Sequence, residues 1–584
     1  MVRLKQCSAE NKDGIYKQKY NKAIDITMTS LKKVTLPLEQ VYRWEKAKAD
    51  DIYLTQPMGN GVIQEYTWNR AVGEARRMAS YLKSLDLPPK SNVAILSKNC
   101  AHWIMNDLAI WMAGHVTVPL YPTLNADTVN YILKHSEAKV LFVGKLDDWD
   151  HMKAGVPEGL PCVSYPLSPP TDFPSWDNIV AEHAPMKEDT VRDAEELATI
   201  VYTSGSTGQP KGVMLSFYAM GVAAAGVAEG LDIGQKDRML SYLPLAHVFE
   251  RYAVEQSSLH VGAQLFFADA LDTFLEDLRR AKPTVFISVP RLWSKFQLGV
   301  FKKMPSKKIE RLLKVPFVSK IVKKKVLTAL GLEYCRFAGS GSAPLSGDII
   351  NWYRNLGLEL LEGYGMSENF AYSHISMPGR SRIGYVGEPL PGVEHRISEI
   401  GEIEVNSPAN MMGYFKDEAK TKESFTEDGF LLTGDKGEID DNNRLKITGR
   451  IKEMFKTSKG KYVAPAPIEN KIIGHECIEM VCVAGAECPQ PHALIMLSDE
   501  TFHKHSDPAF RQEMEESLTK LIADVNGTLD PHEQLQFMTL VNEQWNIENE
   551  FLTPTMKIKR NIIEDTYKPL QDDWYASRKK VIWQ

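Results

Sequence analysis

A stretch rich in glycine and hydroxyl side chains occupies residues 202–212, with the sequence Tyr-Thr-Ser-Gly-Ser-Thr-Gly-Gln-Pro-Lys-Gly. Glycine lets the backbone turn tightly and approach a ligand without interference from a Cβ atom. The hydroxyl groups, the backbone N–H groups and the charge of Lys211 are groups that bind phosphate oxygens. Apolar residues at 197–202 and 212–216 predict a strand on each side. The pattern therefore indicates a phosphate-binding loop; its spacing is not that of a Walker A loop, and a plain surface turn is the simpler alternative.

Six further motifs follow in order along the chain. They are Leu-Pro-Leu-Ala-His-Val-Phe-Glu-Arg at 243–251, Gly-Ser-Gly-Ser-Ala-Pro at 339–344, Glu-Gly-Tyr-Gly-Met-Ser-Glu at 362–368, Thr-Gly-Asp at 433–435, Gly-Arg-Ile-Lys-Glu-Met-Phe-Lys at 449–456 and Leu-Thr-Pro-Thr-Met-Lys at 552–557. With the loop, these motifs resemble those of the adenylate-forming superfamily, which contains acyl-CoA synthetases, luciferases and adenylation domains. The resemblance covers roughly residues 40 to 570.

The resemblance implies a two-step reaction. A carboxylate attacks the α-phosphorus of ATP and expels pyrophosphate, and a thiol then attacks the acyl-adenylate carbonyl and expels AMP. The first step concentrates charge on the phosphates, so it needs electrostatic stabilisation more than covalent catalysis. ATP, Mg²⁺ and coenzyme A are therefore the expected cosubstrates and cofactor, and residues 203–211 are expected to hold the β- and γ-phosphates.

The residues expected to bind nucleotide lie in the loop and in four of the later motifs. They are Thr203, Ser204, Gly205, Ser206, Thr207, Gly208, Lys211, Ser342, Ala343, Pro344, Glu362, Gly363, Tyr364, Gly365, Met366, Ser367, Asp435 and Arg450. Tyr364 is expected to stack on adenine, and Asp435 to accept hydrogen bonds from both ribose hydroxyls. Considered singly, a core aromatic and a turn residue are simpler explanations, and the order of the motifs favours the nucleotide site.

Glu368 and Thr203 are the candidate magnesium ligands, because Mg²⁺ binds few carboxylates together with water and phosphate oxygens. A helix-capping acid is the alternative for Glu368. By resemblance, Lys557 is the catalytic lysine that bridges the substrate carboxylate and the α-phosphate, with Lys211 and Glu368 as the other catalytic groups. Lys452 is by resemblance the hinge between two domains.

Small residues after a strand expected at 334–338 allow adenine and an acyl carbonyl to approach closely, and we assign Gly341 and Gly365 to the acyl substrate. His247 is assigned to the wall of the same site. A carboxylate substrate is already ionised at neutral pH, so the first step needs no base. A core or capping histidine is the alternative.

The chain of 584 residues is too long for one compact core, so it predicts two or more domains. We expect an α/β fold: a polar lead-in at 1–35, a large AMP-binding region of several subdomains at 36–449, and a small mobile α+β domain at 450–584. The seven cysteines are scattered and predict neither a zinc site nor a disulfide framework.

Local patterns divide the large region further. The predicted strands include 92–97 and 139–144. Their alternation with helical patterns over 67–145 predicts a parallel sheet, and 103–113 predicts an amphipathic helix. Seven prolines at 155–190 indicate a long surface connection, and residues 384–405 predict a smaller β subdomain.

The net charge of −6 gives no reason to expect nucleic-acid binding. The N-terminus lacks the apolar core of a signal peptide, and no run of about 18 apolar residues predicts a membrane span. We therefore expect a cytoplasmic protein, while the oligomeric state is left open. Residues 302–325 differ from the rest, because ten cations and one acid give them a net charge of +9 with apolar residues between. This segment predicts a peripheral contact with an anionic membrane, and a solvated helix face is the alternative.

The predicted function is an ATP-dependent acyl-CoA ligase that activates a carboxylic acid. Residues 456–465 and 118–123 resemble the long-chain fatty acyl branch of the superfamily, whereas Phe430 stands where that branch usually has Trp and Gly449 where it has Asp. These departures bear on the acyl preference. Two alternatives are open: a ligase that delivers the acyl group to a carrier protein, and a non-catalytic lipid-binding relative.

Overall fold

The two strands that flank the glycine-rich stretch form an antiparallel hairpin in the computed structural model, which describes residues 34–203, 209–553 and 556–584. Strand β7 (Leu197–Thr203) is an apolar run that is almost wholly buried, and it pairs with β8 (Lys211–Ser216). Both predicted strands are therefore confirmed. The hairpin belongs to a seven-stranded sheet in the described part of the chain, whose strands run in the order β18-β8-β7-β4-β3-β5-β6.

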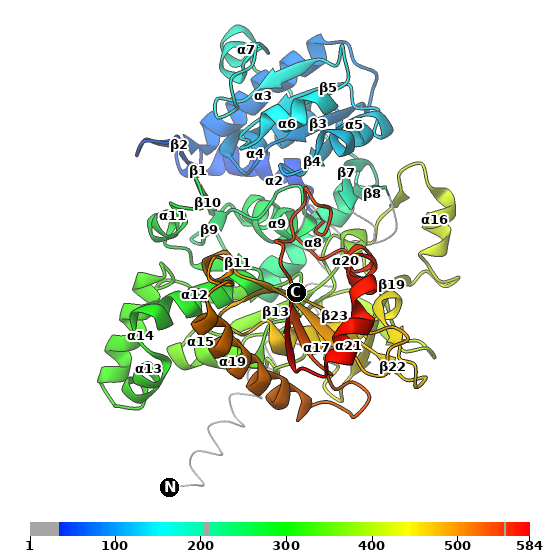
Figure 1. The fold of residues 1–584 in the computed structure, drawn as a ribbon. Helices are drawn as coiled ribbons and strands as arrows, with labels where there is room; N and C mark the ends of the chain where they lie inside the picture. The colour runs from blue at the N-terminus through cyan, green and yellow to red at the C-terminus, as the bar shows by residue number, and fades with distance from the viewer. Residues whose placement is uncertain (1–33, 204–208, 554–555) are drawn as a thin grey trace.

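Parallel pairing dominates the centre of this sheet, as the alternation of strands and helices predicts. Its other strands are β3 (Asn92–Leu96), β4 (Val116–Leu120), β5 (Val140–Val143), β6 (Cys162–Ser164) and β18 (Gly413–Tyr414). The accompanying helices are α2 (Pro37–Ala47), α3 (Trp68–Ser84), α4 (Ala101–Met112), α5 (Ala126–His135), α6 (Trp149–Met152), η2 (Lys153–Gly155) and α7 (Trp176–Glu182). These elements form the blue and cyan part of Figure 1.

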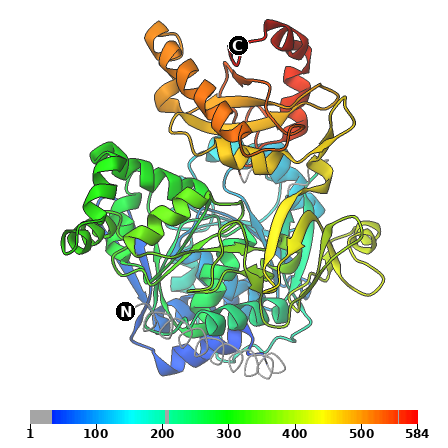
Figure 2. The same ribbon diagram turned by 90° about the horizontal axis from the view of Figure 1, so that it is seen from below.

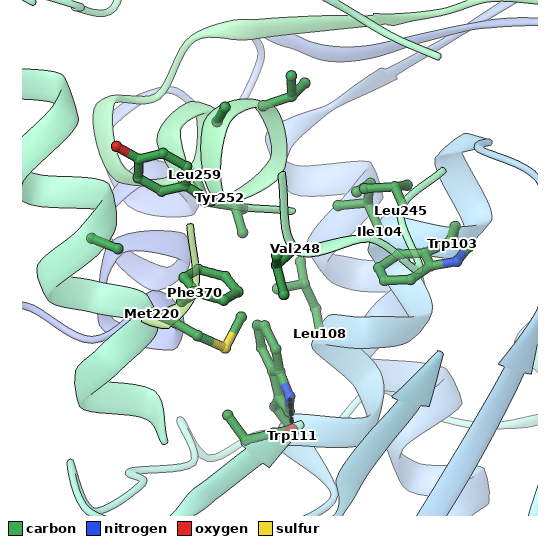
Figure 3. Packing of buried hydrophobic residues seen from close by; sticks show 14 of the residues in the cluster. Trp103, Ile104, Leu108, Trp111, Met220, Leu245, Val248, Tyr252, Leu259 and Phe370 are labelled. Carbon is green, nitrogen blue, oxygen red and sulfur yellow. Dashed lines mark hydrogen bonds between the residues drawn. The ribbon is translucent and has the colours of Figure 1, made fainter. Parts of the chain in front are cut away.

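The helix predicted at 103–113 is present as α4. The prediction that it is amphipathic, with one face in water, is wrong, because all of its residues are buried. It packs against α3, against β4 of the seven-stranded sheet and against a strand of a second sheet. Its polar Asp107 forms a buried ion pair with Arg251 instead of facing water. Figure 3 shows Trp103, Ile104, Leu108 and Trp111 of this helix packed with Met220, Val248 and Phe370 from later elements.

The expectation of a long surface connection at 155–190 is also wrong. The segment contains β6, which pairs with β5 at the edge of the seven-stranded sheet, and α7, which packs on α3. Trp176 is completely buried, and Tyr165 is nearly so. The prolines lie outside these short elements. Their number suggested a loop, although the segment contains a strand and a helix that contribute to the core.

Two further sheets of the large region contain parallel strands. Four strands form the second sheet in the order β2-β1-β10-β9, and five form the third in the order β11-β12-β13-β14-β15. Their bounds are β1 (Ile52–Pro57), β2 (Ile63–Thr67), β9 (Arg238–Ser241), β10 (Gln264–Phe267), β11 (Val285–Ser288), β12 (Phe337–Ser340), β13 (Leu360–Tyr364), β14 (His374–Ile375) and β15 (Glu388–Pro389). The strand expected at 334–338 is β12, which starts and ends later than expected and includes Gly339 and Ser340.

Helices connect these strands and cover their faces. They are α8 (Phe217–Gly230), α9 (Val248–Glu250), the π-helix η3 (Arg251–Gln256), α10 (Ser257–Val261), α11 (Phe274–Ala281), α12 (Pro290–Lys303), α13 (Ser306–Leu313), α14 (Val318–Ala329), α15 (Gly347–Leu356) and η4 (Ser367–Asn369). Among the described residues, no helix is both long and apolar enough to span a bilayer.

The β subdomain expected at 384–405 is part of a four-stranded sheet that continues to residue 450. Its elements are β16 (Glu394–Ile397), β17 (Glu402–Asn406), β19 (Leu431–Ile439) and β20 (Leu445–Arg450), with α16 (Glu418–Glu423) between them. The strands pair antiparallel throughout, and Asp435 of β19 lies opposite Arg450 of β20.

Residues after 450 form a smaller α+β lobe, seen as the yellow-to-red part at the top of Figure 2. Its elements are η5 (Ile451–Glu453), β21 (Phe455–Lys456), β22 (Tyr462–Val463), α17 (Pro465–Ile472), β23 (Ile478–Ala484), β24 (His492–Leu497), α18 (Asp499–Phe502), α19 (Pro508–Asn526), β25 (Met538–Leu540), α20 (Arg560–Tyr567), η6 (Lys568–Leu570), α21 (Gln571–Ser577) and β26 (Val581–Trp583). Two hydrophobic clusters lie within it, one on each side of the sheet β23-β24-β25-β26.

Candidate active site

A cleft of about 3170 Å³ lies between the large region and the C-terminal lobe. Both parts of the chain line it. On one side, α12 contributes Arg291, which pairs with Glu479 of the C-terminal lobe, and Lys302, whose Nζ lies 2.5 Å from Oε2 of Glu500. These ion pairs hold the lobe against the large region beside the cleft.

Every predicted site residue that the structure describes lines this cleft. These residues are Thr203, Lys211, His247, Gly341, Ser342, Ala343, Pro344, Glu362, Gly363, Tyr364, Gly365, Met366, Ser367, Glu368, Asp435, Arg450, Lys452 and Lys557. The remaining predicted residues, Ser204, Gly205, Ser206, Thr207 and Gly208, lie outside the described residues, as do residues 1–33 of the expected lead-in. Motifs far apart in sequence are thus brought to one cavity.

The base of the glycine-rich loop is fixed by the hairpin. Thr203 and Lys211 are partners across the β7–β8 pairing, so both ends of the loop start at the cleft. The ammonium of Lys211 lies 5.6 Å from the centre of the Tyr414 ring, within the range of a cation–π contact. This strand therefore positions a cation at the edge of the cleft.

The segment after β12 needs small residues for a packing reason. A Cβ atom at Gly341 would lie 2.9 Å from Cζ of Phe249. Ser342 has a φ of +69°, in the left-handed region that few residues other than glycine adopt. The turn ends where the backbone N–H of Leu345 donates to Oε1 of Glu362 at 3.1 Å. Burial raises the pKa of that carboxyl to about 7, and this hydrogen bond opposes the shift.

Glu368 lies in the short helix η4, which follows β13. A Cβ atom at Gly365 would come within 2.6 Å of the Ala371 backbone, so the chain folds tightly back on itself here. The hydroxyl of Tyr414 donates to Oε1 of Glu368 at 2.8 Å. Within the part of the chain that the structure describes, Oε2 of Glu368 has no protein hydrogen-bond partner, and the side chain caps no helix. One carboxylate oxygen is therefore left for a ligand in the cleft.

Asp435 is buried at the floor of the cleft and binds two side chains. Oδ2 accepts a hydrogen bond from the Tyr364 hydroxyl at 2.7 Å, and Oδ1 accepts one from Nε of Arg450 at 2.8 Å. The pairing of β19 with β20 places Arg450 opposite Asp435, and the backbone N–H of Asp435 donates to Oγ1 of Thr433. A carboxylate oxygen can accept more than one hydrogen bond, so both oxygens can still receive a donor from a ligand. Tyr364 thus orients Asp435, and its expected stacking on adenine stays a prediction.

Lys557 reaches the cleft from the C-terminal lobe, just before α20. Lys557 is an exposed residue, yet desolvation by the surrounding protein and the nearby Arg450 lower its pKa, while Asp435, Glu453 and Glu368 oppose the shift. The backbone of Lys557 is held by Thr553, whose Oγ1 accepts from the Lys557 N–H at 3.1 Å. Lys557 thus faces the acidic groups contributed by the large region.

His247 forms the wall of the cleft near Lys557. It precedes α9, and its Nδ1 accepts a hydrogen bond from the backbone N–H of Phe249 at 3.1 Å. Burial, with a smaller contribution from Lys557, lowers its pKa to about 3. The ring is therefore neutral at physiological pH, and its capping bond fits the structural alternative as well as a place in the wall.

Apolar side chains from the large region also line the cleft. They belong to Val227, Leu231, Ile233, Val248, Phe249, Tyr252, Ala253, Ile287, Phe337, Leu361, Ile375 and Val386. The side chains come from helices and strands dispersed over the large region. Such a surface is suited to a hydrocarbon chain rather than to a charged ligand.

The structure adds residues that sequence reasoning missed. Tyr414 binds Glu368, and Glu453 pairs with Arg450 at 3.8 Å and with Arg560 at 3.7 Å. Arg560 also binds Glu469 at 2.8 Å, and its side chain is 12% exposed, so it is part of an ion-pair network. No single-sequence signal marks the contacts of Tyr414 with Glu368 and of Arg560 with Glu453 and Glu469, because each joins distant segments, whereas Glu453 and Arg450 are only three residues apart.

Lys452 lies in η5, where the chain passes from the large region to the smaller lobe. Its side chain is exposed, and it borders the cleft. The adjacent Arg450 and Glu453 form the ion pairs described above, so the backbone at Lys452 is connected to both walls of the cleft. The position is suited to a hinge, and a rotation of the C-terminal lobe about Lys452 stays a prediction.

Comparison with known proteins gives relatives over most of the chain. The sequence is 31% identical over 563 residues to the long-chain-fatty-acid–CoA ligase FadD15 of Mycobacterium bovis, covering 88% of this chain and 93% of that protein. It is 30% identical to the long-chain-fatty-acid–CoA ligase 1 of Homo sapiens, covering 85% and 80%. Fatty acyl-CoA synthetase A of Dictyostelium discoideum is 29% identical over 94% of this chain and 92% of its own length.

Solved structures show the same fold at lower sequence identity. The anthranilate CoA ligase AuaEII in complex with anthranoyl-AMP has a TM-score of 0.74 and 21% identity, covering 92% of this chain and 98% of its own. The A domain of carboxylic acid reductase from Segniliparus rugosus, with AMP and a co-purified carboxylic acid, has a TM-score of 0.77 and 19% identity, covering 95% and 96%. Both likenesses confirm the expected α/β fold.

Two family profiles match in the order that the motifs predict. The profile of the AMP-binding enzymes matches residues 41–415, and that of the AMP-binding enzyme C-terminal domain matches residues 453–579. Since the first match alone covers more than half of the chain, the chain belongs to the AMP-binding enzyme family.

Proposed function

We propose that this protein is an ATP-dependent acyl-CoA ligase whose substrate is a long-chain fatty acid. One observation carries the proposal: Lys557 from the C-terminal lobe faces the same cleft as Lys211, Glu368 and Asp435 from the large region. Two ammonium groups and two carboxylates thus surround one cavity, and this arrangement supports the proposal of a nucleotide site. The relatives named as long-chain-fatty-acid–CoA ligases support the substrate class.

In the first half-reaction, a carboxylate oxygen of the fatty acid attacks the α-phosphorus of ATP. The bond between the α-phosphorus and its bridging oxygen to the β-phosphate breaks, and pyrophosphate leaves with that oxygen. Lys557 would lie between the carboxylate and the α-phosphate and offset the charge that builds up in the transition state. Lys211 at the loop base would stabilise the phosphates, and Asp435 would accept hydrogen bonds from the ribose.

The donor set at Glu368 fits a magnesium ion. Oε1 is occupied by Tyr414, which fixes the orientation of the carboxylate, and Oε2 is left for a ligand. Mg²⁺ prefers few protein oxygens and completes its shell with phosphate oxygens and water. When bound, the ion would neutralise charge on the phosphates. Thr203, which pairs with Lys211 where the glycine-rich loop begins, is the second proposed ligand.

In the second half-reaction, the thiol of coenzyme A loses its proton and attacks the acyl carbonyl, and AMP leaves with the oxygen that it shared with the acyl group. The site then needs other groups than it needed for adenylation. We propose that the C-terminal lobe rotates about Lys452 and moves Lys557 away. On this proposal, residues 36–449 and 450–584 act as two domains.

The apolar side chains that line the cleft, among them Val227 and Tyr252, are the proposed site of the acyl chain. His247 directly precedes Val248 and Phe249 of this apolar lining and lies near Lys557. A neutral imidazole is suited to a position between the acyl chain and the nucleotide, because burying a charged ring next to hydrocarbon would raise the free energy of the complex. Gly341 and Gly365 also line the cleft, and their backbones are the proposed neighbours of the acyl carbonyl.

A fatty acid is amphiphilic and is concentrated in membranes. We therefore also propose that this protein is cytoplasmic and makes a peripheral contact with a membrane through residues 302–325.

The test of the enzymatic proposal measures AMP and acyl-CoA formation from ATP, coenzyme A and acids of short, medium and long chain. Long-chain thioester formation that disappears in Lys557→Ala is the expected result. AMP formation that yields a thioester only with an acyl carrier protein would overturn the choice of acceptor. The absence of AMP with every acid would favour the non-catalytic, lipid-binding alternative.

A further inference from the structure

Residues 302–325, here called the basic hairpin, form an exposed surface at the periphery of the large region. The segment comprises the end of α12, all of α13, a turn, and most of α14, and both views show its helices at the edge of the molecule (Figures 1 and 2). None of the residues of α14 is fully buried, and α13 buries only Ile309. The hairpin therefore contributes little to the core.

The charge of this hairpin is not neutralised by the chain. Its ten cations are Lys302, Lys303, Lys307, Lys308, Arg311, Lys314, Lys320, Lys323, Lys324 and Lys325. All except Lys323 are exposed. Over the residues that the structure describes, Lys302 is the only one that forms an ion pair, and Glu310 is the only acid in the segment. Such a surface attracts an anionic partner.

Large apolar side chains are exposed in the same hairpin. Phe317 is 82% exposed, Ile321 57% and Val315 46%. Phe317 ends the turn with a φ of +65°, in the left-handed region that large side chains rarely adopt. Exposed apolar groups are unfavourable in water and indicate a site that another surface covers.

The apolar and basic groups share one face of α14. Within α14, the spacing of three residues aligns Ile321 and Lys324 along the helix, with Lys320 and Lys325 on either side, and Phe317 immediately precedes the helix. On the opposite face, half-buried side chains pack towards α13 and α15. The outward face is thus an apolar stripe bordered by lysines.

We propose that the basic hairpin docks on an anionic lipid bilayer, with Phe317, Ile321 and Val315 inserted among the headgroups. Lysine side chains next to an inserted apolar stripe can extend to the lipid phosphates while their stems remain against the hydrocarbon. A nucleic acid could engage the lysines and stack a base on Phe317, but it would leave the aliphatic Ile321 and Val315 uncovered. The combination therefore favours a lipid surface.

Docking of this hairpin would hold the cleft next to the bilayer. Helix α12 leads directly into the hairpin, and its Leu298 and Phe301 line the cleft. A fatty acid that leaves the bilayer would thus have a short path to the enzyme. That the substrate is a fatty acid rests on the proposed function. The new elements are the negative charge of the lipid surface and the residues that insert into it.

The test is sedimentation of the full-length protein with vesicles of phosphatidylcholine, with and without phosphatidylglycerol, over a series of salt concentrations. We expect strong binding to the anionic vesicles at low salt, which fades as salt screens the lysines. Lys320→Glu with Lys324→Glu should weaken this binding roughly tenfold or more, and Phe317→Ser with Ile321→Ser should weaken it at every salt concentration. A matched control, Lys139→Glu with Lys187→Glu, reverses two exposed lysines outside the hairpin and should bind like the parent protein.

The inference would be overturned by no binding, by equal binding to neutral vesicles, by an equal loss in the control variant, or by full binding in both hairpin variants. Binding of the hairpin to an acidic acyl carrier protein in place of vesicles would also overturn it. All changed side chains are exposed, so thermal unfolding should show intact folding. Thioester formation from a short, water-soluble acid is measured separately and should be unchanged in the hairpin variants. Vesicle binding without any ligase activity would sink the proposed function and leave the docking surface standing.

Discussion

The hydroxyl of Tyr414 donates a hydrogen bond to Oε1 of Glu368 at 2.8 Å, which joins strand β18 of the seven-stranded sheet to the turn that follows β13. A second contact, from the backbone N–H of Met411 to the carbonyl oxygen of Glu368 at 2.7 Å, reinforces the connection. The carboxylate is therefore held in one orientation before any ligand binds. A preorganised carboxylate stabilises a bound cation without reorganisation during the reaction.

Replacement of Glu368 by Gln should impair the use of Mg·ATP, because the amide keeps the shape of the side chain but not the charge. We expect a loss of about 2–4 kcal/mol in transition-state stabilisation, measured as kcat/KM for ATP over a range of Mg²⁺ concentrations. Tyr414→Phe is the matched control: it removes only the orienting hydrogen bond and should cost about 1 kcal/mol. Kinetics like those of the parent protein in Glu368→Gln would show that the magnesium site lies elsewhere.

Replacement of Asp435 by Ala should raise the KM for ATP, because the ribose loses an acceptor with two oxygens. The expected effect is about 2–3 kcal/mol, determined from initial rates of pyrophosphate release. Tyr364→Phe leaves the carboxylate in place and removes one of its two side-chain donors, so its effect should be smaller. An unchanged KM in Asp435→Ala would contradict a ribose contact.

Lys557→Ala should abolish adenylate formation and leave thioester formation from pre-made acyl-AMP largely intact. The reason is that Lys557 offsets charge at the α-phosphate during adenylation, and the proposed rotation of the C-terminal lobe moves it away before the second step. Single-turnover measurements of the two half-reactions provide the test. Lys559→Ala, next but one in sequence, should retain both half-reactions. Equal loss of the two half-reactions in Lys557→Ala would contradict this division of roles.

Lys452→Pro should give the reverse pattern, with adenylation retained and thioester formation lost. Proline fixes φ and removes the backbone N–H, so it blocks a change of backbone conformation at the hinge. Lys452→Ala removes only the exposed side chain and should retain both steps, which separates the backbone effect from the loss of charge. A proline variant that completes both half-reactions at the parental rate would exclude a hinge at this residue.

Glu362 should make the stability of the protein fall with rising pH. Burial raises the pKa of its carboxyl to about 7, compared with an ordinary value of 4.5, so the folded protein binds the proton more tightly than the unfolded chain does. The associated stability is complete below pH 4.5 and is lost as the pH rises through about 7. Its full size is at most about 3 kcal/mol. Denaturant unfolding of the parent protein at pH 5 and pH 8, compared with Glu362→Gln, measures it. The same pH dependence in both proteins would be contrary to this expectation.

The sequence predicted those parts of the site that are local. Glycines and hydroxyl groups bounded by two apolar runs indicated the hairpin of β7 and β8, because strand pairing and tight turns depend on neighbouring residues. The positions of Glu368, Asp435 and Lys557 followed from motif order, and the structure gathers them around one cleft. Their catalytic roles remain predictions.

Local patterns failed where burial depends on distant elements. The polar residues of α4 suggested a solvent-exposed face, but Asp107 is buried because Arg251, far along the chain, neutralises it. The prolines at 155–190 suggested a loop, but the short strand β6 is stabilised by its pairing with β5. In both segments the deciding interaction is a long-range contact, which periodicity does not record.

By itself, the sequence determined which groups are available to this protein: the glycine-rich stretch, the acids, Lys557 and a basic segment with apolar residues. Only the tertiary structure decided which of these groups meet. It placed Tyr414 on Glu368, enclosed Arg560 between Glu453 and Glu469, and set Phe317 and Ile321 on the lysine-bearing outer face. The physical reason is that burial and ion pairing are properties of the packed chain, whereas residue type and spacing are fixed before it folds.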